Sequence, residues 1–206
     1  MCIRDSAWLS AREITVATVP VRALRVSYIG ESGWELHAEN EHVPALFNAL
    51  VNAGKPLGLG FFGAYAMNAM RLEKGYRAWG SDFTTERTPA ETGAGFLIKP
   101  EGRSFTGKDA LLARMASDER WEMVLMELKT QDVDPFYSHP VMHQSEAVGV
   151  VTSAAWGHRT GCALALAFLR TRGIRSDLSV EILGKPVAAT VLDRPPFDPD
   201  NRRMKG

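Results

Sequence analysis

The chain has 206 residues, of which 45% are hydrophobic and 23% charged, and its 24 basic residues balance its 24 acidic ones. This composition is typical of a soluble globular protein and argues against a largely disordered chain. A net charge of zero excludes a uniform positive field, and no apolar run is long enough to span a bilayer, so we expect neither nucleic acid nor membrane as a partner. With two cysteines and no secretory signal pattern, we expect a cytoplasmic protein, or a mitochondrial matrix protein if the source is eukaryotic.

A β-hairpin is predicted over residues 21–38, where two apolar, partly alternating runs flank a glycine-containing turn at 30–33. Strand alternation places Glu35 and His37 on one face and Trp34 on the other. A carboxylate on a rigid strand can accept two parallel hydrogen bonds from a planar edge with two N–H donors, such as a guanidinium or the amino-bearing edge of a pterin. Tyr28 could stack on such a ring, although the same pattern is also typical of the solvated face of an ordinary hairpin.

Helices are predicted next. Apolar residues recur at helical spacing from 43 to 50, and Gly54 and Pro56 end that pattern. Residues 61–73 are rich in Ala, Met and Leu and predict a second, more buried helix, with Gly75 at its C-terminal cap. After a long connection at 80–102, Thr106 and Asp109 form a candidate capping box that opens a third helix.

The end of the second predicted helix carries cations and aromatic rings. Arg71, Lys74 and Arg77 could pair with the carboxylates of a ligand tail, and Tyr76 and Trp79 could wall a ring. The alternative interpretation is structural, because cations near a helix C-terminus complement its dipole and aromatic residues anchor a loop on the core. The pattern leaves both open.

Beyond residue 120, short apolar runs are separated by Gly, Pro, Asp or Ser and predict a small antiparallel barrel or sandwich. The runs are 124–128, 147–152, 161–169, 179–183 and 187–191. We therefore predict two domains, 1–118 and 119–206. His139 and His143 are separated by Pro140, so no helix brings them together and no metal site is predicted.

The string Arg25-Val-Ser-Tyr-Ile-Gly-Glu-Ser-Gly-Trp-Glu35 resembles a signature of the aminomethyltransferase family, to which the glycine cleavage T-protein belongs. The segment from Phe62 to Gly80 is more similar to dimethylglycine and sarcosine dehydrogenases than to the free T-protein. Further similarity at 88–91, 105–111 and 149–153 extends the resemblance over residues 8–195.

The resemblance implies an α+β fold, with the C-terminal half of a folate-binding aminomethyltransferase domain at 1–118 and an antiparallel β-barrel domain at 119–206. It implies tetrahydrofolate as cofactor, with Tyr28, Glu35 and His37 in the pocket and the glutamate on the pterin edge. The further cofactor-binding candidates are Trp34, Arg71, Tyr76 and Trp79.

By the same resemblance, the catalytic aspartate and a flavin domain carrying FAD lie upstream in the same polypeptide. No catalytic residue is therefore assigned in this chain, and we expect this segment alone to be inactive. The expected parent enzyme passes a one-carbon unit from a small amine, such as dimethylglycine or sarcosine, to tetrahydrofolate.

Besides a purely structural module that carries the barrel, two alternatives stay open. One is a free aminomethyltransferase (T-protein) of the glycine cleavage system. The other is a non-catalytic folate-binding or iron–sulfur assembly factor of the same fold, whose characteristic cysteine is missing from the segment Lys74-Gly-Tyr76.

Overall fold

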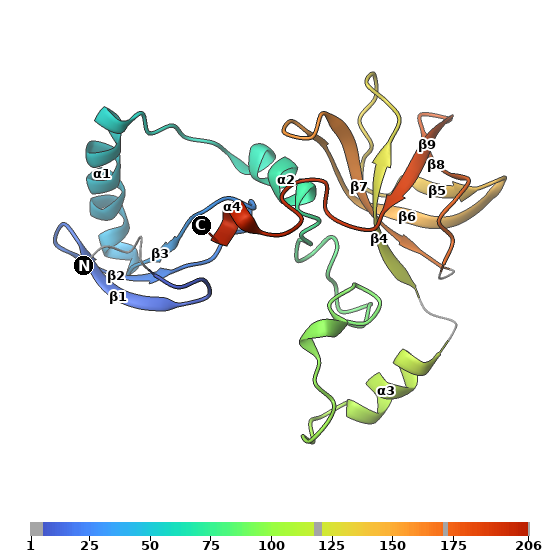
Figure 1. The fold of residues 1–206 in the computed structure, drawn as a ribbon, viewed down its shortest axis with the longest axis horizontal. Helices are drawn as coiled ribbons and strands as arrows, with labels where there is room; N and C mark the ends of the chain where they lie inside the picture. The colour runs from blue at the N-terminus through green and yellow to red at the C-terminus, as the bar shows by residue number, and fades with distance from the viewer. Residues whose placement is uncertain (1–5, 118–120, 171–172, 206) are drawn as a thin grey trace. The chain divides into compact units, whose positions relative to one another are not determined.

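The computed structural model describes residues 6–117, 121–170 and 173–205 (Figure 1). The chain forms two compact units. The first contains the residues up to Met67 together with those from Asp200 onwards, and the second is Asn68–Pro199. In the described ranges, no helix has the length and apolar character needed to cross a membrane.

The first unit contains a three-stranded antiparallel sheet covered by a helix. The strands are β1 (Ala11–Val16), β2 (Val19–Leu24) and β3 (Glu35–His37), in the order β1-β2-β3, and the helices are η2 (Asn40–His42), α1 (Val43–Gly54), η3 (Lys55–Leu57) and α4 (Arg202–Lys205). Alternate residues of β2 are buried, so Val19 and Val21 pack with Leu46 of α1 into a small core. The helix predicted over residues 43–50 is confirmed.

The predicted hairpin is confirmed as the pairing of β2 with β3. Its connection, however, spans residues 25–34, so the short turn expected at 30–33 is wrong, and β1 was not predicted. The longer connection arises because Arg25 and the residues after it leave the strand and form a loop with contacts of its own.

Helix α2 (Ala64–Glu73) begins three residues later than predicted, and Gly75 follows it with a φ of 64°. The expectation of a more buried helix holds only for its C-terminal end, where Leu72 and Glu73 are almost fully buried. At its N-terminal end Tyr65 is 95% exposed. This part of the prediction is wrong, because a high apolar content does not specify which turns of a helix are covered.

Helix α3 (Lys108–Ala116) is found where predicted, after the short helix η4 (Gly95–Leu97). The capping box is wrong. Gly107, with a φ of 85°, occupies the N-cap, and no side chain caps the helix.

The second unit contains a closed antiparallel barrel with the order β4-β7-β6-β5-β8-β9 (Figure 1). The barrel confirms the predicted α+β class with a C-terminal antiparallel barrel. Five of its strands overlap the predicted runs, and β5 was not predicted. The strands are β4 (Glu122–Leu128), β5 (Pro140–His143), β6 (Glu146–Gly157), β7 (Cys162–Leu169), β8 (Leu178–Ile182) and β9 (Lys185–Leu192).

Strand β7 is apolar on both faces because both faces are covered. Ala165 and Ala167 lie in the barrel interior, while Leu166 and Phe168 pack outside the barrel with Leu72 of α2. The C-terminal end of α2 is thereby attached to the barrel wall.

The predicted domain boundary between residues 118 and 119 lies outside the described residues and stays a prediction. The two compact units divide elsewhere, within α2 and after Pro199. Among the residues that the structure describes, no cluster of His, Cys, Asp and Glu could hold a metal ion.

Candidate functional site

Strand β3 presents a polar face, as predicted. Glu35 and His37 are exposed, whereas Leu36 between them packs against the small core of the first unit. The His37 Nε2 atom lies 3.3 Å from Glu35 Oε2, and the side chains are 59% and 54% exposed, respectively. The Oε1 atom of Glu35 has no hydrogen-bond partner within the described ranges, and Oε2, which contacts His37, keeps a second lone pair, so both oxygens can accept from a ligand.

A cleft of about 480 Å³ lies next to this face, a volume in the range of small-molecule sites. His37 contributes to it, and an ion pair of 2.7 Å between Arg22 and Glu13 forms part of its wall. The remaining lining residues are Pro20, Val21, Leu24, Ala38 and Glu39.

Arg25 organises the loop at 25–34 and is only 4% exposed. It donates from Nη1 to the Gly33 carbonyl at 3.0 Å and from Nη2 to Ser32 Oγ at 3.0 Å. Its guanidinium also stacks over the Trp34 ring, 4.4 Å from the centroid. The loop conformation is therefore specified by Arg25, for which the sequence predicts no role of its own.

Three buried polar atoms of this loop, Arg25 Nε, Ser27 Oγ and Trp34 Nε1, have no hydrogen-bond partner in the part of the chain that the structure describes. Leaving a buried donor unsatisfied costs about 1–3 kcal/mol, so such groups call for a partner. Tyr28 lies in the same loop and is half-buried. The loop thus combines a half-buried ring with unused hydrogen-bonding capacity.

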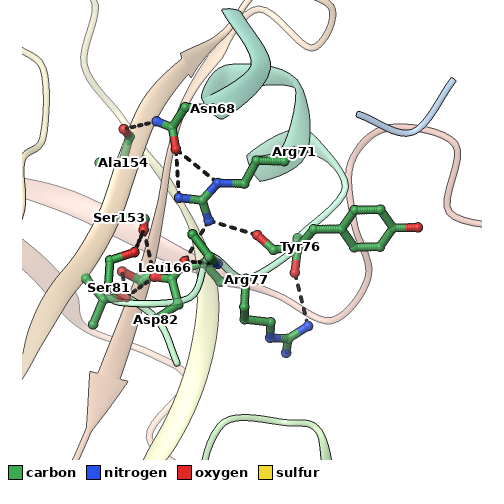
Figure 2. Close-up of polar contacts among 12 residues, drawn as sticks. Asn68, Arg71, Tyr76, Arg77, Ser81, Asp82, Ser153, Ala154 and Leu166 are labelled. Carbon is green, nitrogen blue, oxygen red and sulfur yellow. Dashed lines mark hydrogen bonds and ion pairs between the residues drawn. The ribbon is translucent and has the colours of Figure 1, made fainter. Parts of the chain in front are cut away.

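The other predicted site residues belong to the second unit, at the end of α2 and in the loop after it (Figure 2). Arg71 is 2% exposed and donates from Nε and Nη2 to Asn68 Oδ1 at 3.0 and 2.7 Å. Its Nη1 atom donates to the Tyr76 carbonyl at 2.8 Å and to Asp82 Oδ2 at 2.7 Å. The carboxylate that pairs with Arg71 in the structure is therefore a buried protein group.

Asp82 is fully buried and accepts four hydrogen bonds. Besides Arg71, the backbone N–H of Ala78 donates to Oδ2 at 2.8 Å. The Oδ1 atom accepts from the hydroxyls of Thr152 and Ser153 at 2.5 and 2.7 Å. A buried charge is tolerated when it is paired and its remaining lone pairs are satisfied, and Asp82 meets both conditions.

A β-bulge in β6 explains how two adjacent side chains reach one carboxylate. The pairing of β6 with β7 shifts between Val151 and Ser153, so Thr152 has no partner in the ladder. In a regular strand, neighbouring side chains point to opposite faces, whereas a bulge redirects one of them. Thr152 and Ser153 can therefore both donate to Asp82.

The neighbouring cations also have protein partners. Lys74 is 2% exposed and donates to the Asp198 carbonyl at 2.6 Å. Arg77 donates to the Thr92 carbonyl at 3.1 Å, and burial lowers its pKa. These contacts agree with the structural interpretation of the cations.

The two rings are more accessible than the cations. Trp79 is 78% exposed and Tyr76 is half-buried, with a pKa raised first by burial and then by Asp198. The rings of this segment, rather than its cations, offer surface to a ligand.

The predicted residues thus form two local groups. Glu35 and His37 lie in contact within the first unit, where the loop places Tyr28 and Trp34. Arg71 contacts Tyr76 within the second unit, which also contains Trp79.

Sequence reasoning assigned no role to Asp82, Thr152 or Ser153. Two signals were present: a carboxylate shortly after a cation-rich helix end, and two adjacent hydroxyl residues inside an otherwise apolar strand.

Two family models match the chain. The model described as the GCVT N-terminal domain matches residues 2–102, and the glycine cleavage T-protein C-terminal barrel domain matches residues 122–198. The two matches together account for most of the chain.

Similar proteins carry corresponding names. Mitochondrial dimethylglycine dehydrogenase of Rattus norvegicus is 36% identical over 91% of this chain, and mitochondrial sarcosine dehydrogenase of Mus musculus is 31% identical over 90%. The aminomethyltransferase of Synechococcus sp. (strain WH7803) is 36% identical over 89%. The chain spans about a fifth of the two dehydrogenases and about half of the aminomethyltransferase.

The solved structure of glycine cleavage system aminomethyltransferase T from Bartonella henselae has the same fold, with a TM-score of 0.82 at 20% identity. That likeness covers 95% of this chain and 54% of the solved chain. From the two family models, with these relatives in agreement, the chain belongs to the glycine cleavage T-protein family of aminomethyltransferases and dimethylglycine and sarcosine dehydrogenases.

Proposed function

We propose that this chain is the tetrahydrofolate-binding part of an enzyme that demethylates an N-methylated glycine, such as dimethylglycine or sarcosine. The names of the similar dehydrogenases support the choice of amine, since these proteins match about nine-tenths of the chain. The parent enzyme transfers the one-carbon unit to tetrahydrofolate.

The observation that carries this proposal is the half-exposed carboxylate of Glu35 on a rigid strand, beside the cleft that His37 lines. The amino-bearing edge of a pterin offers two parallel N–H donors, and a carboxylate accepts both. The buried donors of the loop at 25–34 suit the acceptor atoms of the same ring. The residues present thus fit the cofactor in hydrogen-bonding character.

The other candidates are proposed for each unit taken by itself. In the first unit, Tyr28 and Trp34 are the proposed ring contacts to the pterin, from the loop at 25–34. In the second unit, Tyr76 and Trp79 are the proposed ring contacts to the ligand, and Arg71 shapes the loop that carries them.

Tetrahydrofolate supplies the acceptor for the one-carbon unit when it is bound. We assign the catalytic aspartate and the FAD of the parent enzyme to a part of the polypeptide outside this chain, because the similar dehydrogenases are several times longer. In a eukaryotic source the parent enzyme acts in the mitochondrial matrix, as the names of these relatives suggest.

Calorimetric titration of the chain with tetrahydrofolate tests the proposal. Replacing Glu35 with Gln removes one acceptor of the bidentate pair and should weaken binding by about 1–3 kcal/mol, or roughly 5- to 150-fold in Kd. Glu146→Gln, an exposed glutamate at the start of β6, is the matched control and should bind like the parent chain. Equal affinity of the Glu35→Gln variant would refute the assignment.

A second function is favoured by the aminomethyltransferase of Synechococcus, which has the same 36% identity to this chain as the dimethylglycine dehydrogenase. In that case the chain belongs to a free T-protein that receives its one-carbon unit without a flavin. Purifying the polypeptide encoded by the complete reading frame and recording its absorption spectrum separates the two functions, because a bound flavin gives a visible absorption band that a free T-protein lacks.

A further inference from the structure

Asp82 connects the barrel wall to the loop that carries the exposed rings (Figure 2). Its two oxygens are divided between these elements. Oδ1 accepts only from the hydroxyls of Thr152 and Ser153 in β6, and Oδ2 accepts only from Arg71 and the Ala78 N–H, among the described residues. The carboxylate is thus a bridge with one side on the barrel and one side on the loop.

We propose that Thr152 and Ser153 are positioning residues for the loop at 76–82, acting through Asp82. By holding Oδ1, the two hydroxyls orient the carboxylate, and Oδ2 then holds both Arg71 and the Ala78 N–H. The barrel strand thereby determines ligand affinity without touching the ligand. The identity of that ligand as tetrahydrofolate rests on the function proposed above.

The loop geometry explains why Asp82 controls the rings. Arg71 fixes the Tyr76 carbonyl, and Asp82 Oδ2 fixes the Ala78 N–H directly. The Ala78 carbonyl in turn accepts from the backbone N–H groups of Asp82 and Phe83, at 2.9 and 3.0 Å. A displaced Asp82 carboxylate would release the loop on both sides of Ala78, immediately before Trp79.

The bulge makes this arrangement specific. Without the register shift in β6, one of the two hydroxyls would point away from Asp82 and the carboxylate would keep a single donor on its barrel side. Two donors from adjacent residues restrict the rotation of the carboxylate more than one donor does. The bulge therefore directs both hydroxyls of β6 towards Asp82 Oδ1.

Removing the hydroxyls is a gentler test than removing Asp82. An Asp82→Asn substitution would leave Arg71 buried without a countercharge, and the unit could then fail to fold. The double variant Thr152→Val with Ser153→Ala keeps the ion pair and removes both barrel-side donors, together with the 3.3 Å contact between the Ser153 and Ser81 hydroxyls. The pair Thr152→Ser with Ser153→Thr keeps both hydroxyls and serves as the rescue.

Two readouts are measured on the full chain: amide hydrogen exchange in peptides that cover residues 76–83, and calorimetric Kd for tetrahydrofolate. The double variant should exchange about tenfold faster in this loop and bind about tenfold more weakly, a change of about 1.4 kcal/mol. Exchange in β4 and β7 should stay unchanged, and the rescue should restore both values. Thr190→Val on β9, an exposed hydroxyl of the same barrel, should change neither.

Several results would overturn the proposal. Unchanged exchange in the loop means that the hydroxyls do not position it, and faster exchange throughout the barrel means that they only stabilise the fold. A looser loop with unaltered affinity removes the link to the ligand. If the parent chain binds no tetrahydrofolate, the proposed function fails, and the exchange measurement alone then decides whether the hydroxyls position the loop.

Discussion

Replacing Glu91 with Gln should destabilise the second unit, because this glutamate is 3% exposed and collects several donors. Its Oε2 atom accepts from the backbone N–H and the hydroxyl of Thr88, both at 2.9 Å. Its Oε1 atom accepts from Arg114 Nη2 at 2.8 Å and from the Trp121 N–H at 3.1 Å. A glutamine offers one acceptor oxygen and turns an NH₂ group towards donors at the other position.

The magnitude follows from the pKa of Glu91. Burial by itself raises this pKa, but the hydrogen bonds from Thr88, Arg114 and Trp121 outweigh burial and lower it from 4.5 to about 2. A carboxyl whose pKa falls on folding stabilises the native state above its unfolded pKa and loses this contribution as the pH drops through its folded pKa. The contribution is about 3 kcal/mol at pH 7 and roughly 1.5 kcal/mol at pH 3.

Urea unfolding of the chain and of the Glu91→Gln variant between pH 7 and pH 3 measures this effect. The free energies of unfolding should differ by about 3 kcal/mol at pH 7, and the difference should shrink below pH 4.5 as Glu91 becomes protonated in the parent chain. A difference that stays constant down to pH 3, or one below about 1 kcal/mol at pH 7, would refute the reasoning.

Two further predictions concern the barrel. Gly149→Ala should lower the free energy of unfolding by about 1–3 kcal/mol, measured by urea or heat, because the added Cβ would lie 2.2 Å from the Phe168 carbonyl oxygen. The control outside the barrel is Gly63→Ala, whose added Cβ meets nothing within 4 Å and should leave stability nearly unchanged. Equal stability of the two variants would contradict the packing of β6 on β7. Burial raises the pKa of the Cys162 thiol above its ordinary value of 9.0. In a Cys2→Ser background, alkylation of Cys162 by iodoacetamide should therefore be slow at pH 7 and accelerate only above pH 9, because the thiolate is the reactive form. Fast labelling at pH 7 would show that the thiol is not shielded.

Local sequence signals were sufficient where an element depends mainly on its own residues. The spacing of apolar residues from 43 to 50 predicted α1, and short apolar runs predicted five barrel strands, since binary pattern and turn residues are local properties. The strand β5 was not predicted because it has only four residues and begins at Pro140. The capping box was placed at Thr106, although Gly107 caps α3, because the motif S/T-x-x-D/E does not by itself show whether a backbone N–H is within reach.

The arrangement of Glu35 and His37 in the first unit was predictable from the sequence, whereas the contacts of Arg71 in the second unit were not. The alternation that exposes Glu35 and His37 is a property of one strand and followed from the sequence. The partner of Arg71 did not, because Asp82 comes from a loop and its other donors come from β6, about 70 residues away along the chain. No local pattern records such a pairing.

The sequence by itself determined the α+β class, the positions of most elements and the polar face of β3, because residue periodicity and turn chemistry act over a few residues. Only the tertiary structure decided that Arg71 and Lys74, at the C-terminal end of α2, are buried, whereas the Trp79 ring in the following loop remains accessible. It also decided that a bulge in β6 brings Thr152 and Ser153 to a single buried carboxylate. The reason is physical: a buried charge persists only where donors from distant segments converge on it, and that convergence exists only in the folded chain.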